Sequence, residues 1–136
     1  MTIFVFDSSA VLRFVDKEAG AERVRDVFRS CAGGASEPFI SAAQWGEITA
    51  IQRRRLGAQA QDRLLAGLIE LQLRIIPVTA ERAERAAAIR VDRKISNADS
   101  YAIELAMDSP DHLLVTADYD FKAVADLARI EFLPMK

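Results

Sequence analysis

The chain has 136 residues, of which 51% are hydrophobic and 28% are charged, and its formal net charge is −2. This length suits one domain, and the high hydrophobic fraction with nearly balanced charge excludes a mostly disordered chain. The charge also excludes a strongly basic domain that would hold nucleic acid through bulk charge.

Short apolar runs alternate with segments of helical periodicity along the chain. In chain order the sequence predicts strand Ile3–Phe6, helices Ser9–Lys17 and Gly20–Cys31, strand Phe39–Ser41, helices Ala42–Leu56 and Ala58–Leu73, strand Arg74–Val78, helices Ala80–Arg93 and Asn97–Met107, strand Leu113–Thr116, helix Phe121–Ala128 and strand Ile130–Phe132. The pattern predicts one α/β domain over residues 1–136, with a largely parallel central sheet of about 4–5 strands flanked by helices.

Two predicted helix starts have the spacing of a capping box, in which a serine side chain and a residue three positions later cap the helix together. These pairs are Ser41 with Gln44 and Ser96 with Asp99. They support helices beginning near residues 42 and 97.

Cys31 and His112 are the only residues of their types, which excludes an internal disulfide and argues against zinc sites built from thiolates or histidine pairs. No stretch reaches the roughly 18 apolar residues of a membrane span, and the N-terminus lacks the features of a signal peptide. We therefore expect a soluble cytoplasmic protein with no membrane partner.

Acidic residues follow two of the predicted strands. Asp7 comes directly after Ile3–Phe6, and Asp118 and Asp120 follow Leu113–Thr116. In open α/β sheets ligands bind beyond the carboxyl ends of the strands, so these acids lie at the end where a site is expected. Asp7 and Asp118 could also serve only as helix caps, and this alternative stays open for each of them.

Asp99 falls within the apolar face of its predicted helix. On a wheel of about 100° per residue, we expect Ser100 and Glu104 on the opposite, solvent-exposed side. The surrounding apolar residues are Ala98, Ala102, Ile103, Leu105 and Ala106. An inward carboxylate costs roughly several kcal/mol unless a cation or hydrogen-bond donors meet it, so Asp99 indicates a site. Its alternative role is to complete the cap with Ser96.

Glu47 repeats this pattern less clearly, one turn into the helix that follows Phe39–Ser41. It can reach the same rim as Asp7, although a solvent-exposed glutamate paired with Arg54 is the alternative. Together, Asp7, Glu47, Asp99 and Asp118 would repel one another unless a hard cation lay among them, and oxygen ligands suit Mg²⁺ or Mn²⁺. Such an ion activates water to attack a phosphodiester.

Four segments carrying these acids resemble the PIN domain, and specifically the VapC-type toxins of toxin–antitoxin pairs. The segments are Ile3 to Leu12, Ile40 to Ile48, Ile95 to Ala106, and Leu113 to Phe121, the last of which resembles the family's "T-x-D-x-D-F" ending. The resemblance covers nearly the whole chain, and the four motifs occur in the family's order.

The resemblance implies an endoribonuclease that requires Mg²⁺ or Mn²⁺ and hydrolyses RNA phosphodiester bonds. It maps Asp7, Glu47, Asp99 and Asp118 onto the family's catalytic acids, and Asp7, Asp99 and Asp118 onto its metal ligands. It makes Asp120, Ser9 and Thr116 auxiliary residues. It also implies a homodimer and a cognate antitoxin protein.

Two basic clusters are candidates for contacting the RNA backbone. The first is Arg53, Arg54 and Arg55, and the second includes Arg93 and Lys94, just before Asp99. Cations at the end of a helix are also favoured by the helix dipole, so a purely structural role stays open for both.

Two other functions are compatible with parts of this pattern. One is a phosphatase with Asp7 as nucleophile, although such enzymes need a second aspartate where Ser9 stands. The other is a non-catalytic, receiver-like protein-binding module whose acids only cap helices. The RNA target, the number of metal ions and the identity of the antitoxin cannot be predicted from the sequence.

Overall fold

The computed structural model describes residues 1–135 and contains one parallel sheet with the strand order β3-β2-β1-β4-β5. The strands are β1 (Thr2–Phe6), β2 (Ser36–Ser41), β3 (Arg74–Ile76), β4 (His112–Thr116) and β5 (Arg129–Phe132). The predicted α/β fold with a parallel sheet is confirmed.

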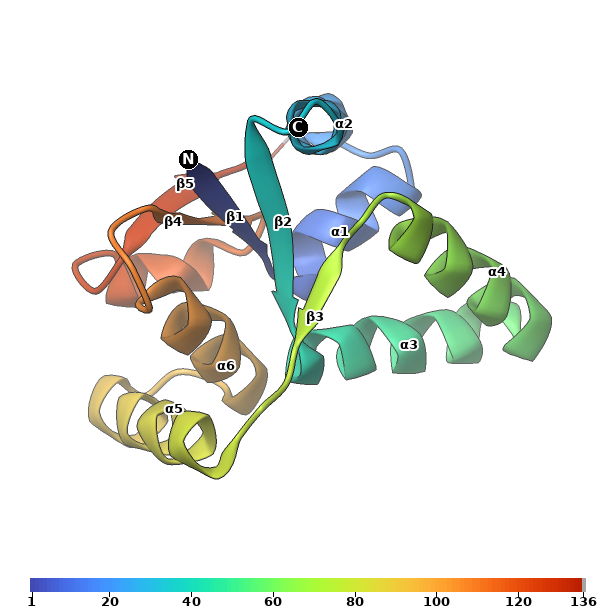
Figure 1. Ribbon diagram of the computed structural model, residues 1–136. Helices are drawn as coiled ribbons and strands as arrows, with labels where there is room; N and C mark the ends of the chain where they lie inside the picture. Colours follow the sequence, from blue (N-terminus) through green and yellow to red (C-terminus); the bar gives the residue numbers. More distant parts are fainter. Residues whose placement is uncertain (136) are drawn as a thin grey trace.

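Helices cover both faces of this sheet (Figure 1). On one face lie α1 (Ser8–Val15), α2 (Ala21–Ala32), α3 (Ala42–Leu56) and α4 (Ala58–Glu70). On the other lie α5 (Ala80–Arg93), α6 (Asn97–Ala106) and the 3₁₀ helix η1 (Tyr119–Val124). None of the described helices is long and apolar enough to cross a membrane.

Successive residues of β1 enter two different cores, because side chains of a strand alternate between its faces. Phe4 and Phe6 pack with α1, α2 and α3 residues, whereas Val5 packs with α6 and η1 residues. Both faces are therefore apolar, which explains the continuous apolar runs that predicted the strands.

The strand order reverses at β1. The chain adds β2 and β3 on one side of β1, and then crosses to place β4 and β5 on the other side. Connections that leave in opposite directions open a crevice at the carboxyl ends of the two strands, which is where ligands bind in such sheets. By this rule a ligand site is expected where β1 ends at Phe6 and β4 ends at Thr116.

Two details of the sequence prediction are wrong. Phe121–Ala128 is not an α-helix: the 3₁₀ helix η1 occupies Tyr119–Val124, and the chain turns before β5. Ser100 and Glu104 are not on a solvent-exposed side, since both are buried, and Glu104 is only 3% exposed. Other predicted boundaries differ from the observed ones by at most three residues.

Glu104 is buried because a second helix supplies its counter-ions. Arg82 and Arg85 of α5 donate to the Glu104 carboxylate at 3.0 Å, and Arg82 also pairs with Asp108. A helix wheel cannot reveal this, because α6 lies between the sheet core and α5 and is covered on both sides. A buried carboxylate is tolerated when cations and donors meet it in this way.

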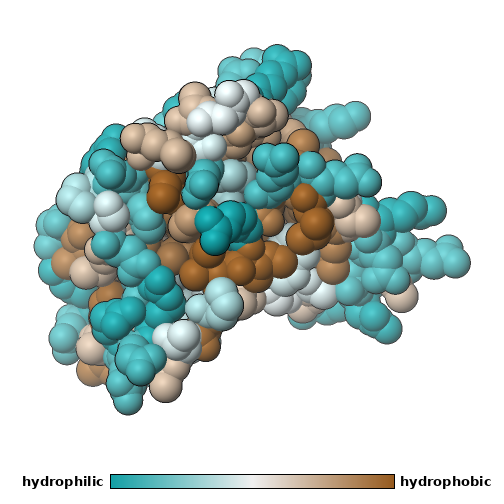
Figure 2. Space-filling view, in the orientation of Figure 1, coloured by the Kyte–Doolittle hydropathy of each residue, from teal (hydrophilic) through white to brown (hydrophobic). Residues whose placement is uncertain are grey.

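The space-filling view in Figure 2 shows hydrophobic side chains gathered in the middle of one face, with hydrophilic side chains to either side. The hydrophilic projection on the right of this view corresponds to the region of α3 and α4 in Figure 1. On this face the exposed hydrophobic residues are therefore separated from most of the hydrophilic ones.

We predict that replacing Gln52 with methionine will stabilise the protein. Gln52 is 0% exposed, and neither its Nε2 nor its Oε1 atom has a hydrogen-bond partner within residues 1–135. Because methionine has similar length and helix propensity but no unpaired amide, the free energy of unfolding should rise by about 1 kcal/mol in urea denaturation. Gln61→Met is the control, since Gln61 accepts a bond from Arg53 and should give no gain. A loss of stability in Q52M would contradict the prediction.

Candidate active site

Asp7 lies at the carboxyl end of β1 and is 2% exposed. Its carboxylate accepts hydrogen bonds from the Ala10 amide at 3.0 Å, from the Ser9 hydroxyl at 2.8 Å and from the Thr116 hydroxyl at 2.7 Å. Burial raises the pKa of Asp7 to about 6, although these bonds oppose the rise, and the charge of Asp99 adds to it. Asp7 therefore caps α1 and also belongs to a charged neighbourhood.

Ser9 and Thr116 connect Asp7 to the loop after β4. Thr116 Oγ1 accepts from the Asp118 amide at 2.9 Å, and Ser9 Oγ accepts from the Ala117 amide at 2.9 Å. Each hydroxyl thus donates to Asp7 and accepts from the β4 loop. The structure places both predicted auxiliary residues in direct contact with Asp7.

Glu47 lies in the second turn of α3 and is half-buried. Its Oε2 atom accepts a hydrogen bond from Ser8 Oγ at 3.0 Å, which joins α3 to the residue after Asp7. The alternative ion pair with Arg54 is not found among the described residues.

Asp99 lies in the first turn of α6 and is half-buried. Burial raises its pKa to about 6, and the charges of Asp118, Asp120 and Glu47 raise it further, while a hydrogen bond with Ser96 opposes the rise. The predicted cap is also present, because Ser96 Oγ accepts from the Asp99 amide at 3.2 Å. Its capping role and its acidic surroundings thus occur together.

Asp118 is half-buried and begins η1, where its Oδ1 atom accepts from the Asp120 amide at 2.9 Å. Asp120 is exposed at the outer edge of the same turn. Both carboxylates lie close enough to Asp99 to influence its pKa. The β4 loop therefore contributes its acids to the same rim as α6.

The acids share one rim but do not form a closed cage. Within residues 1–135, no group of three or more His, Cys, Asp or Glu side chains has the arrangement needed to hold a metal ion. In the same part of the chain, no Lys or Arg forms an ion pair with Asp7, Glu47, Asp99, Asp118 or Asp120. The rim has the oxygen donors that suit Mg²⁺ or Mn²⁺.

Gln44 is a residue that the sequence analysis assigned to another role. The predicted capping box with Ser41 is wrong, because Ser41 Oγ accepts from the Ala43 amide and the Gln44 side chain points away from that cap. Gln44 is 1% exposed and bonds instead to the Ser8 amide and the Ala98 carbonyl. No local signal in the sequence marks this role, because both partners are distant along the chain.

The basic clusters are exposed or half-buried, and several of their side chains already have partners. Arg53 donates to Gln61, Arg55 pairs with Asp16 and Arg93 pairs with Asp126. Exposed ion pairs of this kind are weak, so these partners do not prevent contact with a phosphate. Arg54 and Lys94 are exposed at the ends of α3 and α5.

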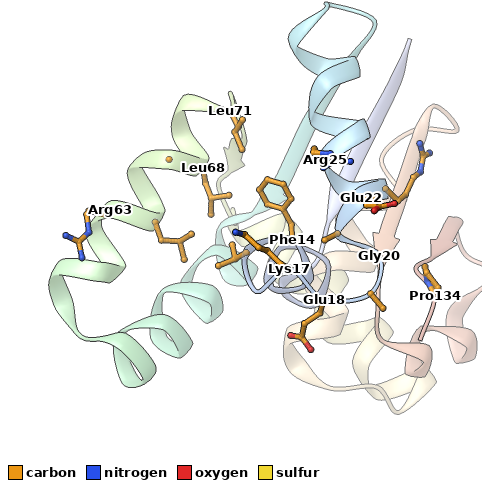
Figure 3. A pocket seen from close by; sticks show the side chains of 16 residues that line it. Phe14, Lys17, Glu18, Gly20, Glu22, Arg25, Arg63, Leu68, Leu71 and Pro134 are labelled. Carbon is orange, nitrogen blue, oxygen red and sulfur yellow. The ribbon is translucent and has the colours of Figure 1, made fainter. Parts of the chain in front are cut away.

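A large groove lies apart from the acidic rim, with a volume of about 1110 Å³. Figure 3 shows Leu68 of α4 and Leu71, the residue directly after α4, on one side of it and Phe14 of α1 on the other. Its lining includes the basic residues Lys17, Arg23, Arg25 and Arg63 and the acidic residues Glu18 and Glu22. The groove is thus apolar at its centre and mainly basic at its margin.

Comparison with known proteins agrees with the fold. The family model described as PIN domain matches residues 4–127. The VapBC2 structure of Rickettsia felis, solved with a promoter DNA fragment, has a chain with a TM-score of 0.75 and 15% identity, covering 98% of this chain and 100% of that one. VapC20 of Mycobacterium tuberculosis, a toxin that cleaves the sarcin-ricin loop, has a TM-score of 0.70 and 23% identity. That match covers 98% of this chain and 100% of VapC20.

A third similar structure is the DNA-bound VapBC of Salmonella typhimurium, with a TM-score of 0.71 and 19% identity, covering 97% of this chain and 98% of that one. No curated protein sequence gives a significant match. At these identities the structural neighbours establish the shared fold.

We predict that Asp99→Asn will stabilise the metal-free protein at pH 7.5 more than at pH 5.0. The pKa of Asp99 is raised from its ordinary value of 3.8 to about 6 in the folded chain. Between these pH values the folded chain therefore binds more protons than the unfolded chain, and the free energy of unfolding falls as pH rises through this range. After a discount for solvent screening, the gain should be about 1 kcal/mol larger at pH 7.5, a few degrees in Tm. Calorimetry at both pH values measures it.

Asp111→Asn is the matched control, because Asp111 is exposed and lies before β4, at the opposite end of that strand from the acidic rim. Its effect should be the same at both pH values. An equal effect of D99N at both pH values would contradict the prediction.

Proposed function

The chain belongs to the PIN domain family, and we propose that it is a metal-dependent endoribonuclease that hydrolyses RNA phosphodiester bonds as the toxin of a VapBC-type toxin–antitoxin pair. The proposal includes Mg²⁺ or Mn²⁺ as cofactor, RNA as substrate, an antitoxin protein as partner and a homodimer as the assembled form. The neighbouring folds support it, since they include VapBC complexes and a toxin that cleaves the sarcin-ricin loop.

The single observation that carries the proposal is the unpaired acidic rim at the reversal point of the sheet. Asp99 is half-buried and is influenced by Asp118, Asp120 and Glu47, and no arginine or lysine among residues 1–135 forms an ion pair with them. By contrast, the buried Glu104 on the same helix has two arginine partners. Glu104 is neutralised by arginines, whereas the acids around Asp99 have no cation in the described part of the chain. This difference favours a bound metal ion beside Asp99.

Asp7, Asp99 and Asp118 are the residues that we propose to hold the ion. A divalent cation there would supply an activated water and would stabilise charge on the scissile phosphate. The fit rests on the donor set, because carboxylate oxygens are the ligands that Mg²⁺ and Mn²⁺ prefer.

The remaining residues of the site have positioning roles in this proposal. Ser9 and Thr116 hold the Asp7 carboxylate in one orientation while they bond to the loop that contains Asp118. Glu47 completes the acidic quartet and is oriented by Ser8. Asp120 has an auxiliary role at the outer edge. Fixing such groups before substrate arrives lowers the cost of reaching the reactive geometry.

RNA would approach the acids past the basic clusters. Arg53, Arg54 and Arg55 project at the end of α3, and Arg93 and Lys94 lie at the end of α5. Contacts to phosphate from such residues add affinity without sequence preference. Such local contacts would allow a chain whose net charge is −2 to bind RNA.

The groove between α1, α2 and α4 suits a protein partner. Its apolar centre, which includes Phe14, Leu68 and Leu71, fits the apolar face of an amphipathic segment. Its lining has four basic and two acidic residues, and this basic excess favours acidic residues on that segment, although one of the four, Arg23, is paired with Glu131. We propose that the antitoxin occupies this groove. The apolar and the basic contacts to the antitoxin would then lie on one surface, away from the acidic rim.

For the nuclease, we expect cleavage of RNA with Mn²⁺ and no cleavage with EDTA. Asp7→Asn and Asp99→Asn should each reduce the rate by at least about 100-fold, because each removes a proposed metal ligand. Asp111→Asn, the exposed acid at the opposite end of β4, should keep the wild-type rate. Gel analysis of several structured RNAs measures the rates.

Cleavage that survives both D7N and D99N would show that the activity belongs to another site or to a contaminant. Absence of cleavage by the wild-type protein with all RNAs would favour the non-catalytic binding module. Metal-dependent hydrolysis of a small phosphate ester without cleavage of RNA would favour the phosphatase.

For the partner, we predict that Leu71→Glu will prevent co-purification with the co-expressed product of a small reading frame, should one be found beside the gene, as the source of the proposed antitoxin. Leu71 lines the groove and is 37% exposed, so the substitution places a charge in the apolar contact at little risk to folding. Ile69→Glu is the matched control, since Ile69 is 50% exposed on α4 but does not line the groove. Equal loss of binding in both variants, or in neither, would contradict the assignment of the groove.

A further inference from the structure

We propose that Gln44 is a positioning residue that fixes the relative positions of three of the four site acids, namely the proposed ligands Asp7 and Asp99 together with Glu47, before any metal binds. The inference rests on the proposed function, since it concerns the assembly of the same site. It assigns to one buried amide the task of joining α1, α3 and α6.

The two bonds of Gln44 lead directly to the neighbours of two acids. Its Oε1 atom accepts from the Ser8 amide at 2.7 Å, and Ser8 follows Asp7. Its Nε2 atom donates to the carbonyl of Ala98, and Ala98 precedes Asp99. The main chain beside each of these acids is therefore tied to the same side chain.

The third acid is part of the same arrangement because it lies on the same helix. Glu47 is three residues after Gln44 in α3, and residues at this spacing share one side of a helix. Ser8 donates its amide to Gln44 and its hydroxyl to Glu47 at 3.0 Å. Ser8, the residue after Asp7, thus bonds to α3 twice, once to Gln44 and once to Glu47.

Only an amide of this length can make both bonds. An amide hydrogen needs an acceptor and a carbonyl oxygen needs a donor, so the orientation of the Gln44 amide is determined by its two partners. Glutamate loses the donor, methionine loses both groups, and asparagine is one carbon shorter. The side chain is 1% exposed, so water cannot readily replace either bond.

A second glutamine on the same helix separates this role from simple packing. Gln52 is two turns further along α3 and is equally buried, but its amide has no hydrogen-bond partner in the part of the chain that the structure describes. Both glutamines can be replaced by methionine with nearly the same change in volume. A difference between the two variants therefore reports the hydrogen bonds rather than the loss of a buried amide.

The test compares Q44M and Q52M with the wild-type protein in two measurements. In the metal-free protein, we expect the Ser8 amide to exchange with solvent at least about tenfold faster in Q44M and at an unchanged rate in Q52M. In calorimetric titration with Mn²⁺, we expect Kd to rise about 10- to 100-fold in Q44M, as for other residues that orient metal ligands, and to change less than twofold in Q52M.

A second pair of variants tests the same bond from its other side, in case Q44M does not fold. Ser8 occupies the first position of α1, where proline is well tolerated, and Asp7 has the extended backbone that precedes a proline. Ser8→Pro removes both the amide hydrogen and the hydroxyl, whereas Ser8→Ala removes only the hydroxyl. We expect S8P to bind Mn²⁺ at least about fivefold more weakly than S8A.

The outcomes distinguish a failure of the positioning role of Gln44 from a failure of the proposed metal site. If the wild-type protein binds Mn²⁺ and Q44M binds it equally well, the positioning role is wrong and the proposed function stands. Equal affinities of S8P and S8A would lead to the same conclusion. If the wild-type protein binds no Mn²⁺ at all, the proposed metal site is wrong and the positioning role is lost with it.

Discussion

The arrangement of the whole site depends on one buried carboxylate, that of Asp7 at the carboxyl end of the central strand. A charge in that position is tolerated only if donors surround it, and the chain supplies three from three places: Ala10, Ser9 and Thr116. Two of these donors also accept bonds from the β4 loop. Satisfying this one anion therefore ties the start of α1 to the β4 loop at the ends of two paired strands.

The comparison between Glu104 and Asp99 shows how the same helix treats two acids differently. Glu104 is buried against Arg82 and Arg85, so its charge is neutralised inside the protein. Asp99 is half-buried, and the nearest charges that affect it are negative. Removing charge from water costs free energy unless it is compensated. Arginines compensate the charge of Glu104, whereas no ion pair among the described residues compensates that of Asp99. This contrast supports a cation from solution at Asp99.

The elements were predictable because both faces of the sheet are covered, which makes the strands continuously apolar and separates them clearly from the amphipathic helices. Strand β2 was predicted only in part, from Phe39, because Pro38 argues against a central strand. The structure shows why proline is accepted: pairing with β3 begins at Phe39, so Pro38 has a strand neighbour on one side only. That information lies in the pairing register, which a single sequence does not contain.

The same distinction applies to the site. The acids were identifiable because each has a local signal, either the end of a strand or an unusual place on a helix wheel. Gln44 has no such signal, because its partners Ser8 and Ala98 are 36 and 54 residues away in the sequence, and its local spacing from Ser41 suggested a different bond. The exposure of Glu104 was mispredicted for the same reason, since its partners lie on another helix. Residues that react can be recognised by their type and position, whereas residues that orient them are defined by contacts that exist only after folding. Positioning residues such as Gln44 are therefore the part of this site for which the structure is indispensable.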